Sequence, residues 1–423
     1  MEFVILNEKE FLDYSIKSKY TSFFQTPYWA EIKKTNGWDS HYVGMKKDGN
    51  LVAATLLLSK NIKFFKKMFY APRGFLLDYN DFKLIEEFTL ELKKYLKENN
   101  ALFLKINPYL DYQERTVDGD VVPNTRKDDF FALMKKLGYK HMGFYINQDE
   151  KKDLEPRWIS VLDLKDKTFD ELFKEMRSST KWRINNSKKN SLKIIDATYE
   201  ELDEFKKLMK HTGERREFID RPLSYYQNMY KVLKEKDLIK VLLIEINFKE
   251  LKELSVKTME DNDIKLKNME GNKKKEGQVK EIKLEQERLK EKIKTLDEHI
   301  SKDGDKKIIS GGLYMLYGHE IIYLFGASYK DYMKYNAQYL LQYYMINYAK
   351  DHGYDAFNFY GIDGNFNKES KGYGLFDFKR GFDARVHELV GEFDLVISKN
   401  SYRLYKIAFS CYKWVKNLSL HKK

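Results

Sequence analysis

Residues 358–366 read NFYGIDGNF, and residues 374–395 read GLFDFKRGFDARVHELVGEFDL. The first stretch overlaps an apolar run, Ala356–Tyr360, of the kind that forms strands. It follows a segment with helical periodicity, Asn336–His352, in which apolar residues recur every three or four positions. A long helix followed at once by a strand indicates a mixed α/β structure.

The same mixture extends over most of the chain. Further strands are predicted at Leu51–Leu58, Lys67–Ala71, Leu102–Ile106, Arg157–Leu162, Ile239–Ile246, Gly311–Tyr317 and Glu320–Phe325. Further helices are predicted at Phe82–Glu98, Asp129–Leu137, Phe169–Lys188, Tyr199–Thr212 and Leu223–Leu233. Val52–Leu104 and Gly311–Phe359 share one order, in which hairpin strands precede a long helix and another strand. This shared order predicts two similar α/β units.

One segment has no core of its own. The 59 residues from Lys249 to Lys307 contain no Phe, Trp or Tyr, although aromatic residues make up 15% of the chain. Helical stretches are predicted around 248–268 and 278–301. In the second stretch a 3,4 alternation, typical of a coiled-coil seam, runs through Val279, Ile282, Gln286, Leu289, Ile293, Leu296 and Ile300. The segment therefore predicts an antiparallel helical hairpin, and a disordered charged insertion is the alternative.

The charge of the chain favours polyanionic partners. With 77 Lys and Arg against 65 Asp and Glu, the net charge is +12. Residues 174–193 carry seven cations and one acid, and residues 399–423 carry seven cations and no acid beside an apolar helical stripe. The first stretch could meet an RNA backbone, and the second could lie on an anionic leaflet or an RNA. A solvated basic face is the alternative for both.

Several classes of protein do not fit this sequence. It has no run of about 18 apolar residues and no signal peptide, so we expect a soluble, cytoplasmic protein. A single cysteine, Cys411, excludes an internal disulfide, and its place in a helical stripe predicts a buried thiol. No phosphate-binding or dinucleotide-binding glycine motif is present, and the eight His lack ligand spacing. We expect no metal and no cofactor.

The two quoted stretches resemble the carboxyl-terminal hallmark of the Fem-type (FemABX) aminoacyl-tRNA-dependent transferases, which add bridge amino acids to the peptidoglycan stem peptide. That hallmark is a Gly-rich turn, then Gly-Leu/Tyr-x-x-Phe-Lys-x-x-Phe, then a Gly-Glu-Phe-Asp strand. Supporting motifs follow in the family's order along the whole chain, at 25–34 (QTPYWAEIKK), 70–74 (YAPRG), 183–189, 212–226 (TGERREFIDRPLSYY), 325–328 and 336–341.

The resemblance implies two acetyltransferase-like (GNAT-like) α/β domains with an inserted coiled-coil arm. We expect the first domain over residues 1–150, and the second over 151–246 and 308–398. The arm would occupy 247–307, and a basic amphipathic helix would occupy 399–423.

The resemblance also implies the reaction. We expect transfer of Gly, Ala or Ser from aminoacyl-tRNA to the stem-peptide amine of a UDP-linked or lipid-linked muropeptide precursor, with peripheral membrane contact through residues 399–423 as an open option. One alternative is tRNA-dependent aminoacylation of a lipid headgroup or a protein. Another is a non-catalytic RNA-binding scaffold that uses the coiled coil.

Site residues follow from the family's motifs. The pair that contacts the tRNA end falls on Phe378 and Lys379, and Lys379 would stabilise the oxyanion that forms when an amine attacks the ester. The acceptor carries a diphosphate, which suits two cations from separate regions, and matching places them on Lys33 and Arg221. Tyr225 lies one helical turn beyond Arg221. Lys34 competes with Lys33, whereas Arg215 and Arg216 compete with Arg221.

One position departs from the family pattern. Relatives commonly carry an acidic residue before the proline of LKINPY, where this chain has Asn107. An amide cannot act as a general base. We therefore expect the attacking amine to lose its proton through the substrate or water, with Glu392 as a weaker alternative.

Overall fold

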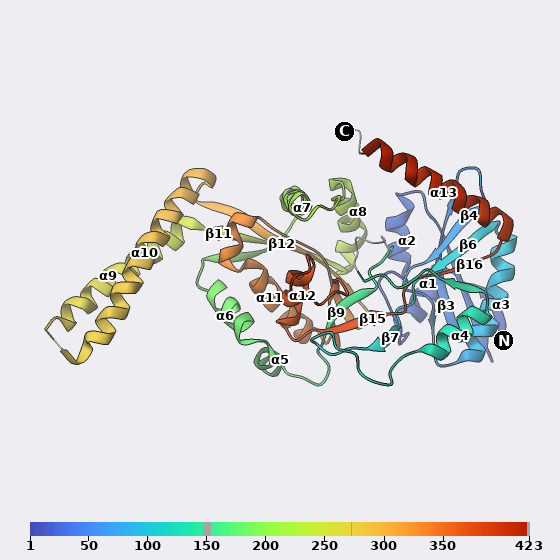
Figure 1. Cartoon of the computed structure of the whole chain (residues 1–423), viewed down its shortest axis with the longest axis horizontal. Coiled ribbons are helices and arrows are strands. Elements are labelled where there is room, and N and C mark those ends of the chain that lie inside the picture. Colours follow the sequence, from blue (N-terminus) through green and yellow to red (C-terminus); the bar gives the residue numbers. More distant parts are fainter. Residues whose placement is uncertain (147–153, 272, 421–423) are drawn as a thin grey trace.

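The computed structural model describes residues 1–146, 154–271 and 273–420, and Figure 1 shows two sheet units in a row with a helical arm at one end. The first sheet runs in the order β1 (Glu2–Ile5), β2 (Asp39–Lys47), β3 (Asn50–Asn61), β4 (Lys67–Ala71), β6 (Ala101–Ile106), β16 (Phe393–Val396) and β8 (Tyr139–His141), with β5 (Leu76–Leu77) on β3. Its helices are α1 (Glu8–Ser15), α2 (Pro27–Lys34), α3 (Phe82–Glu98) and α4 (Asp128–Lys136).

The second sheet runs in the order β10 (Leu192–Asp196), β11 (Ile239–Asn247), β12 (Lys306–Tyr317), β13 (Glu320–Ser328), β14 (Ala356–Gly361), β9 (Trp158–Asp163), β15 (Arg385–Leu389) and β7 (Asp111–Glu114). Its helices are α5 (Phe169–Glu175), α6 (Ser178–Ser187), α7 (Leu202–Arg216), α8 (Leu223–Leu233), α11 (Ala337–Asp351) and α12 (Tyr373–Arg380). The arm is α9 (Phe248–Met269) and α10 (Glu276–Asp303), and α13 (Lys399–Leu420) ends the described chain.

The two units repeat one arrangement. In the first, the hairpin β3–β4 is followed by α3 and by β6, which pairs parallel to β4. In the second, the hairpin β12–β13 is followed by α11 and by β14, which pairs parallel to β13. The predicted fold class, two similar α/β units with an inserted helical arm, is confirmed.

A shared core joins the two sheets. Residues on β3 alternate, so that Ala53 and Leu57 face α3 and α4 while Leu56 and Leu58 face the second unit. Between the sheets, Phe23 packs edge-to-face on Tyr317 with ring centroids 6.3 Å apart. The two sheets therefore behave as one packed body.

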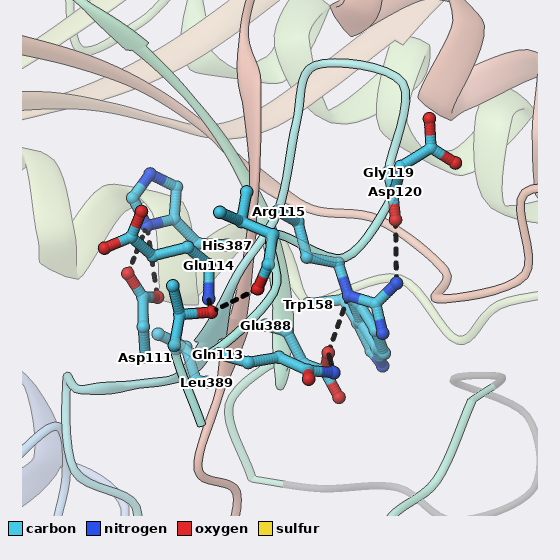
Figure 2. A network of polar contacts seen from close by, with 12 residues as sticks. Asp111, Gln113, Glu114, Arg115, Gly119, Asp120, Trp158, His387, Glu388 and Leu389 are labelled. Carbon is cyan, nitrogen blue, oxygen red and sulfur yellow. Dashed lines mark hydrogen bonds and ion pairs between the residues drawn. The ribbon is translucent and has the colours of Figure 1, made fainter. Parts of the chain in front are cut away.

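Two strands lie in the sheet of the other unit. Strand β7, from residues 1–150, pairs with β15 in the second sheet, and β16, from residues 308–398, pairs with β6 and β8 in the first. Figure 2 shows the polar contacts at β7, where Glu388 accepts hydrogen bonds from Gln113 Nε2 and Arg115 Nε, both at 2.6 Å. The domain boundaries stay a prediction, and this exchange ties the two units together across them.

The predicted helix Phe169–Lys188 is two helices. Met176 and Arg177 both have ψ of 146°, which ends α5 and starts α6. The main-chain N–H of Arg177 donates to Gly381 O at 3.0 Å, and its guanidinium bonds Asp377 Oδ1 at 2.9 Å. Contact with α12 therefore overrides a local preference for one continuous helix.

The arm is the predicted hairpin. Every predicted seam residue of α10 is buried or half-buried. At the polar break, Gln286 Nε2 donates to Asp263 Oδ1 at 2.7 Å on α9. The base of the arm, where Leu296 meets Phe248 and Leu251, belongs to the core of the second unit.

The predicted burial of Cys411 is wrong, because its side chain is exposed on α13. None of the helices in the described ranges combines the length and the apolarity that crossing a bilayer would require.

The root of the arm gives a stability test. We expect Leu296→Ala to lower the free energy of unfolding by ~2 to 5 kcal/mol, because it leaves a cavity in a fully buried position. Leu284→Ala, on the same helix but 53% exposed, should change it by less than ~0.5 kcal/mol. Urea denaturation of both variants checks this, and equal effects would contradict the burial of the arm base.

Candidate functional site

Lys379 lies in the last turn of α12 with its side chain buried. Its Nζ donates to the main-chain oxygens of Tyr360, at 3.2 Å, and Gly361, at 2.6 Å. Among the described residues these carbonyls are its hydrogen-bond acceptors, and an ammonium has three N–H groups. One N–H therefore has no acceptor among the described residues.

Burial lowers the pKa of Lys379 to about 7, and Asp363 opposes that shift. Phe376 and Phe382, on either side of Lys379 in the chain, are buried as well. Gly381 is required by close packing, since a Cβ there would lie 2.3 Å from Thr180 Oγ1. Near neutral pH the group can therefore exist as ammonium or as amine.

Tyr360 turns the backbone toward Lys379. The pairing of β14 with β9 slips between Asn358 and Tyr360, and Tyr360 has φ of 66°, which is unusual for a bulky residue. Asn358 Oδ1 stabilises the bulge by accepting from Tyr360 N at 2.8 Å. Position 364 requires a glycine, because a Cβ there would lie 2.2 Å from the side chain of Trp158. The glycine-rich stretch 358–366 therefore shapes the carbonyl cradle of Lys379.

The hydroxyl of Tyr360 points to a second charged cluster, where it donates to Glu155. Burial raises the pKa of Glu155, and the neighbouring cations Arg73 and Lys33 oppose that shift. Arg73 is itself fixed by a hydrogen bond from Nη2 to Pro156 O at 2.8 Å. Tyr360 therefore links this cluster to Lys379.

Lys33 and Arg221 meet in the same cluster. Burial lowers the pKa of Lys33, Glu155 opposes the shift, and the nearby positive charge of Arg221 adds to it. The Arg221 guanidinium lies 5.5 Å from the ring of Tyr225, whose pKa is raised to about 12 by burial. Lys33 lies on α2 and Tyr225 on α8, Arg221 lies just before the start of α8, and the two helices pack together. The structure thus brings the three predicted acceptor-binding residues together.

The competing cations are placed differently. Lys34 and Arg216 are exposed at the surface. Burial lowers the pKa of Arg215, and its Nε is buried without a hydrogen-bond partner in the described part of the chain. Arg221 is exposed as well, but its charge acts on Lys33, whereas that of Arg216 acts on Arg215. Lys33 and Arg221 are therefore the pair that fits a common anion.

Phe378 lies beside a cationic helix. Its ring contacts Tyr339 edge-to-face with centroids 5.0 Å apart, and the Arg183 guanidinium of α6 lies 5.3 Å from the centroid of the Tyr339 ring. Trp182 on α6 is 62% exposed. A surface of cations and aromatic rings therefore leads from α6 to Phe378, which suits a single-stranded nucleic-acid end.

Glu392 and Asn107 lie next to the charged cluster, since Glu392 acts on the pKa of Glu155 and Asn107 bonds the main chain of Arg73. Glu392 is buried, and its carboxylate accepts from Lys105 Nζ at 2.9 Å and Leu154 N at 2.8 Å. Asn107 Oδ1 accepts from Arg73 N at 2.9 Å, whereas its buried Nδ2 has no hydrogen-bond partner among the described residues. Both side chains therefore make structural hydrogen bonds beside the cluster, and a catalytic role for Glu392 stays a prediction.

Three residues of the site were not predicted. Tyr360 and Arg73 lie within quoted motifs, NFYGIDGNF and YAPRG, so their motifs could have found them. Nothing in the local sequence marks Glu155, which enters the site from the connection between the units. In the ranges that the structure covers, no group of three or more His, Cys, Asp or Glu is placed to hold a metal ion.

Comparison with known proteins agrees with this geometry. The model of the FemAB family matches residues 6–410. "Aminoacyltransferase FemA" of Staphylococcus epidermidis is 34% identical over 418 residues, covering 96% of this chain and 98% of the relative. The protein of that name from Staphylococcus aureus (strain MRSA252) is 34% identical over 417 residues, covering 96% and 97%.

A solved structure matches as well. The crystal structure of FemX has 25% sequence identity and a TM-score of 0.77, covering 96% of this chain and 99% of that one. The similarity extends over both units and over the segment that carries Lys379. The chain belongs to the FemAB family.

Proposed function

We propose that this protein transfers an amino acid, glycine, alanine or serine, from aminoacyl-tRNA to the stem-peptide amine of a peptidoglycan precursor and so builds the interpeptide bridge. Membership of the FemAB family and relatives named as aminoacyltransferases support the proposal. The observation that carries it is the link at Tyr360, which places buried Lys379 on one side and the Lys33–Arg221 pair on the other.

The transfer reaction needs stabilisation of the negative charge on the oxyanion more than it needs activation of the ester. The amine nitrogen attacks the ester carbonyl carbon, a C–N bond forms, and the C–O bond to the tRNA ribose breaks. The proton of the amine passes through water or substrate to the ribose oxygen. The remaining N–H of Lys379, in its ammonium form, would bind the oxyanion, and removal of such a donor typically costs ~2.7 to 4 kcal/mol.

The acceptor would be held by its diphosphate. Lys33 comes from α2 and Arg221 from the segment just before α8, so they can contact different phosphate oxygens. Tyr225 packs beneath the guanidinium and keeps it in place. UDP-linked and lipid-linked precursors both carry this diphosphate, so either fits the pair.

The donor would approach along α6. Trp182, Arg183, Tyr339 and Phe378 offer rings and cations to the unpaired end of a tRNA. The arm, with 17 cations and 15 acids between residues 247 and 307, would orient the tRNA more than it would add affinity. No cofactor takes part in this scheme, and a cytoplasmic location follows from the two substrates.

The transfer reaction tests the role of Lys379. We expect Lys379→Met to lower kcat by ~100-fold to 1,000-fold because the oxyanion loses its donor. The measurement is transfer of radiolabelled amino acid from charged tRNA to UDP-linked or lipid-linked muropeptide. Lys368→Met, at an exposed lysine near the same helix, is the control. Unchanged transfer would contradict the role of Lys379 in binding the oxyanion, and no transfer by the wild type with any charged tRNA would overturn the proposal and favour the scaffold alternative.

The same variant has a distinct signature in stability. Because the pKa of Lys379 falls from 10.5 to about 7 on folding, the unfolded chain holds a proton that the folded chain lacks between those pH values. In that window the free energy of unfolding of the wild type therefore rises with pH, by ~1.4 kcal/mol per pH unit from this group. We expect Lys379→Met to be more stable than the wild type at pH 7.5. At pH 9 this difference in the free energy of unfolding should be smaller by about 1 to 2 kcal/mol. Urea unfolding at both pH values checks this, and a constant difference would contradict the lowered pKa.

The acceptor site gives a third test. We expect Lys33→Gln and Arg221→Gln each to raise KM for the UDP-linked acceptor by ~10-fold to 100-fold, because each removes a charged hydrogen bond to phosphate. The value of kcat should change little, since both groups bind remote from the reacting ester. Lys34→Gln and Arg216→Gln are the matched controls. A larger effect of Lys34→Gln than of Lys33→Gln, or of Arg216→Gln than of Arg221→Gln, would assign the phosphate contact to the control residue instead.

A further inference from the structure

Helix α13 has an apolar side that the described part of the chain leaves uncovered. Tyr402, at its start, is buried and contacts Phe103 edge-to-face with centroids 5.3 Å apart. Leu404 and Ile407 are each 62% exposed, and Cys411, one turn further, is exposed too. Their 3,4 spacing places them along one side of the helix. The helix is thus anchored to the first unit by one side and presents an apolar stripe on another.

A second exposed apolar group lies beside this stripe. At the turn between β3 and β4, Phe65 contacts Tyr405 of α13 edge-to-face with centroids 5.7 Å apart. The preceding residue, Phe64, has φ of 66° and is 89% exposed. Figure 1 shows α13 running past β4 and β6. The turn and the helix therefore form one surface, which we call the tail patch: residues 60–67 and the exposed side of 399–411.

The tail patch is uniformly basic. Residues 60–67 contain Lys60, Lys63, Lys66 and Lys67, and residues 399–411 contain Lys399, Arg403 and Lys406; neither segment contains an acid. Lys63 Nζ lies 5.1 Å from the ring of Phe64. Cations around protruding aromatic and aliphatic side chains suit the boundary between headgroups and acyl chains in an anionic bilayer.

We propose that the tail patch docks this protein on the surface of an anionic phospholipid bilayer, with Phe64, Leu404 and Ile407 inserted among the lipids. A nucleic acid would use the lysines, but it offers nothing to Leu404 and Ile407, whose aliphatic side chains gain from leaving water. The inference rests on the proposed function in one respect: it brings the enzyme to the bilayer in which a lipid-linked acceptor resides.

Vesicle binding of the full chain tests the tail patch. We expect co-sedimentation with phosphatidylcholine vesicles that contain phosphatidylglycerol, weakened by salt, and little with phosphatidylcholine alone. Phe64→Glu combined with Ile407→Glu should weaken binding by about tenfold or more, because it places two acids in the inserted apolar face. The matched control is Ile264→Glu combined with Leu284→Glu, at arm residues that are 57% and 53% exposed. The control should bind as the wild type does.

Transfer to the water-soluble UDP-linked acceptor separates this inference from the proposed function. The Phe64→Glu, Ile407→Glu variant should retain that activity. Equal binding to both kinds of vesicle, or equal binding by this variant and the wild type, would overturn the docking surface while leaving the transfer reaction standing. Loss of charged-tRNA affinity in this variant without any vesicle binding would assign the patch to RNA and also overturn the proposal.

Discussion

A buried ammonium held by two main-chain carbonyls is the interaction on which the site depends. Lys379 Nζ reaches Tyr360 O and Gly361 O because a bulge and a positive φ turn this part of β14 out of the regular ladder. The hydroxyl of Tyr360 also donates a hydrogen bond to Glu155. A change in the backbone at Tyr360 would therefore move the two halves of the site together.

Burial acts with opposite signs on the two charges beside Tyr360. It favours the amine form of Lys379 and the neutral acid form of Glu155, so the pKa of the lysine is lowered and that of the glutamate is raised. Groups of this kind are unfavourable for folding, and they are typical of positions kept for chemistry. The surrounding aromatic core, with Phe376, Phe378 and Phe382 around Lys379, supplies the packing that offsets this cost.

The bounds of helices were predicted well from the sequence, whereas contacts between distant segments were predicted less well. Helices α3 and α8 have the predicted bounds, because strong apolar periodicity and Asp81 or Pro222 at their starts act locally. The split between α5 and α6 was missed because its cause, the contact of Arg177 with α12, lies some 200 residues away. The exchange of β7 and β16 was missed for the same reason, since pairing partners of short strands leave no local signal. Lys33, Arg221 and Tyr225 were found through motifs, whereas Glu155 depends on the path of a connecting segment.

The placement of β16 has a consequence for synthesis on the ribosome. Strand β6 is paired with β4 on one side, but its other edge is closed by residues 393–396, near the end of the chain. Until those residues emerge, the sequence ALFLKI presents an open apolar edge of the kind that recruits neighbouring chains. The first sheet is therefore completed only after residues 393–396 have been translated.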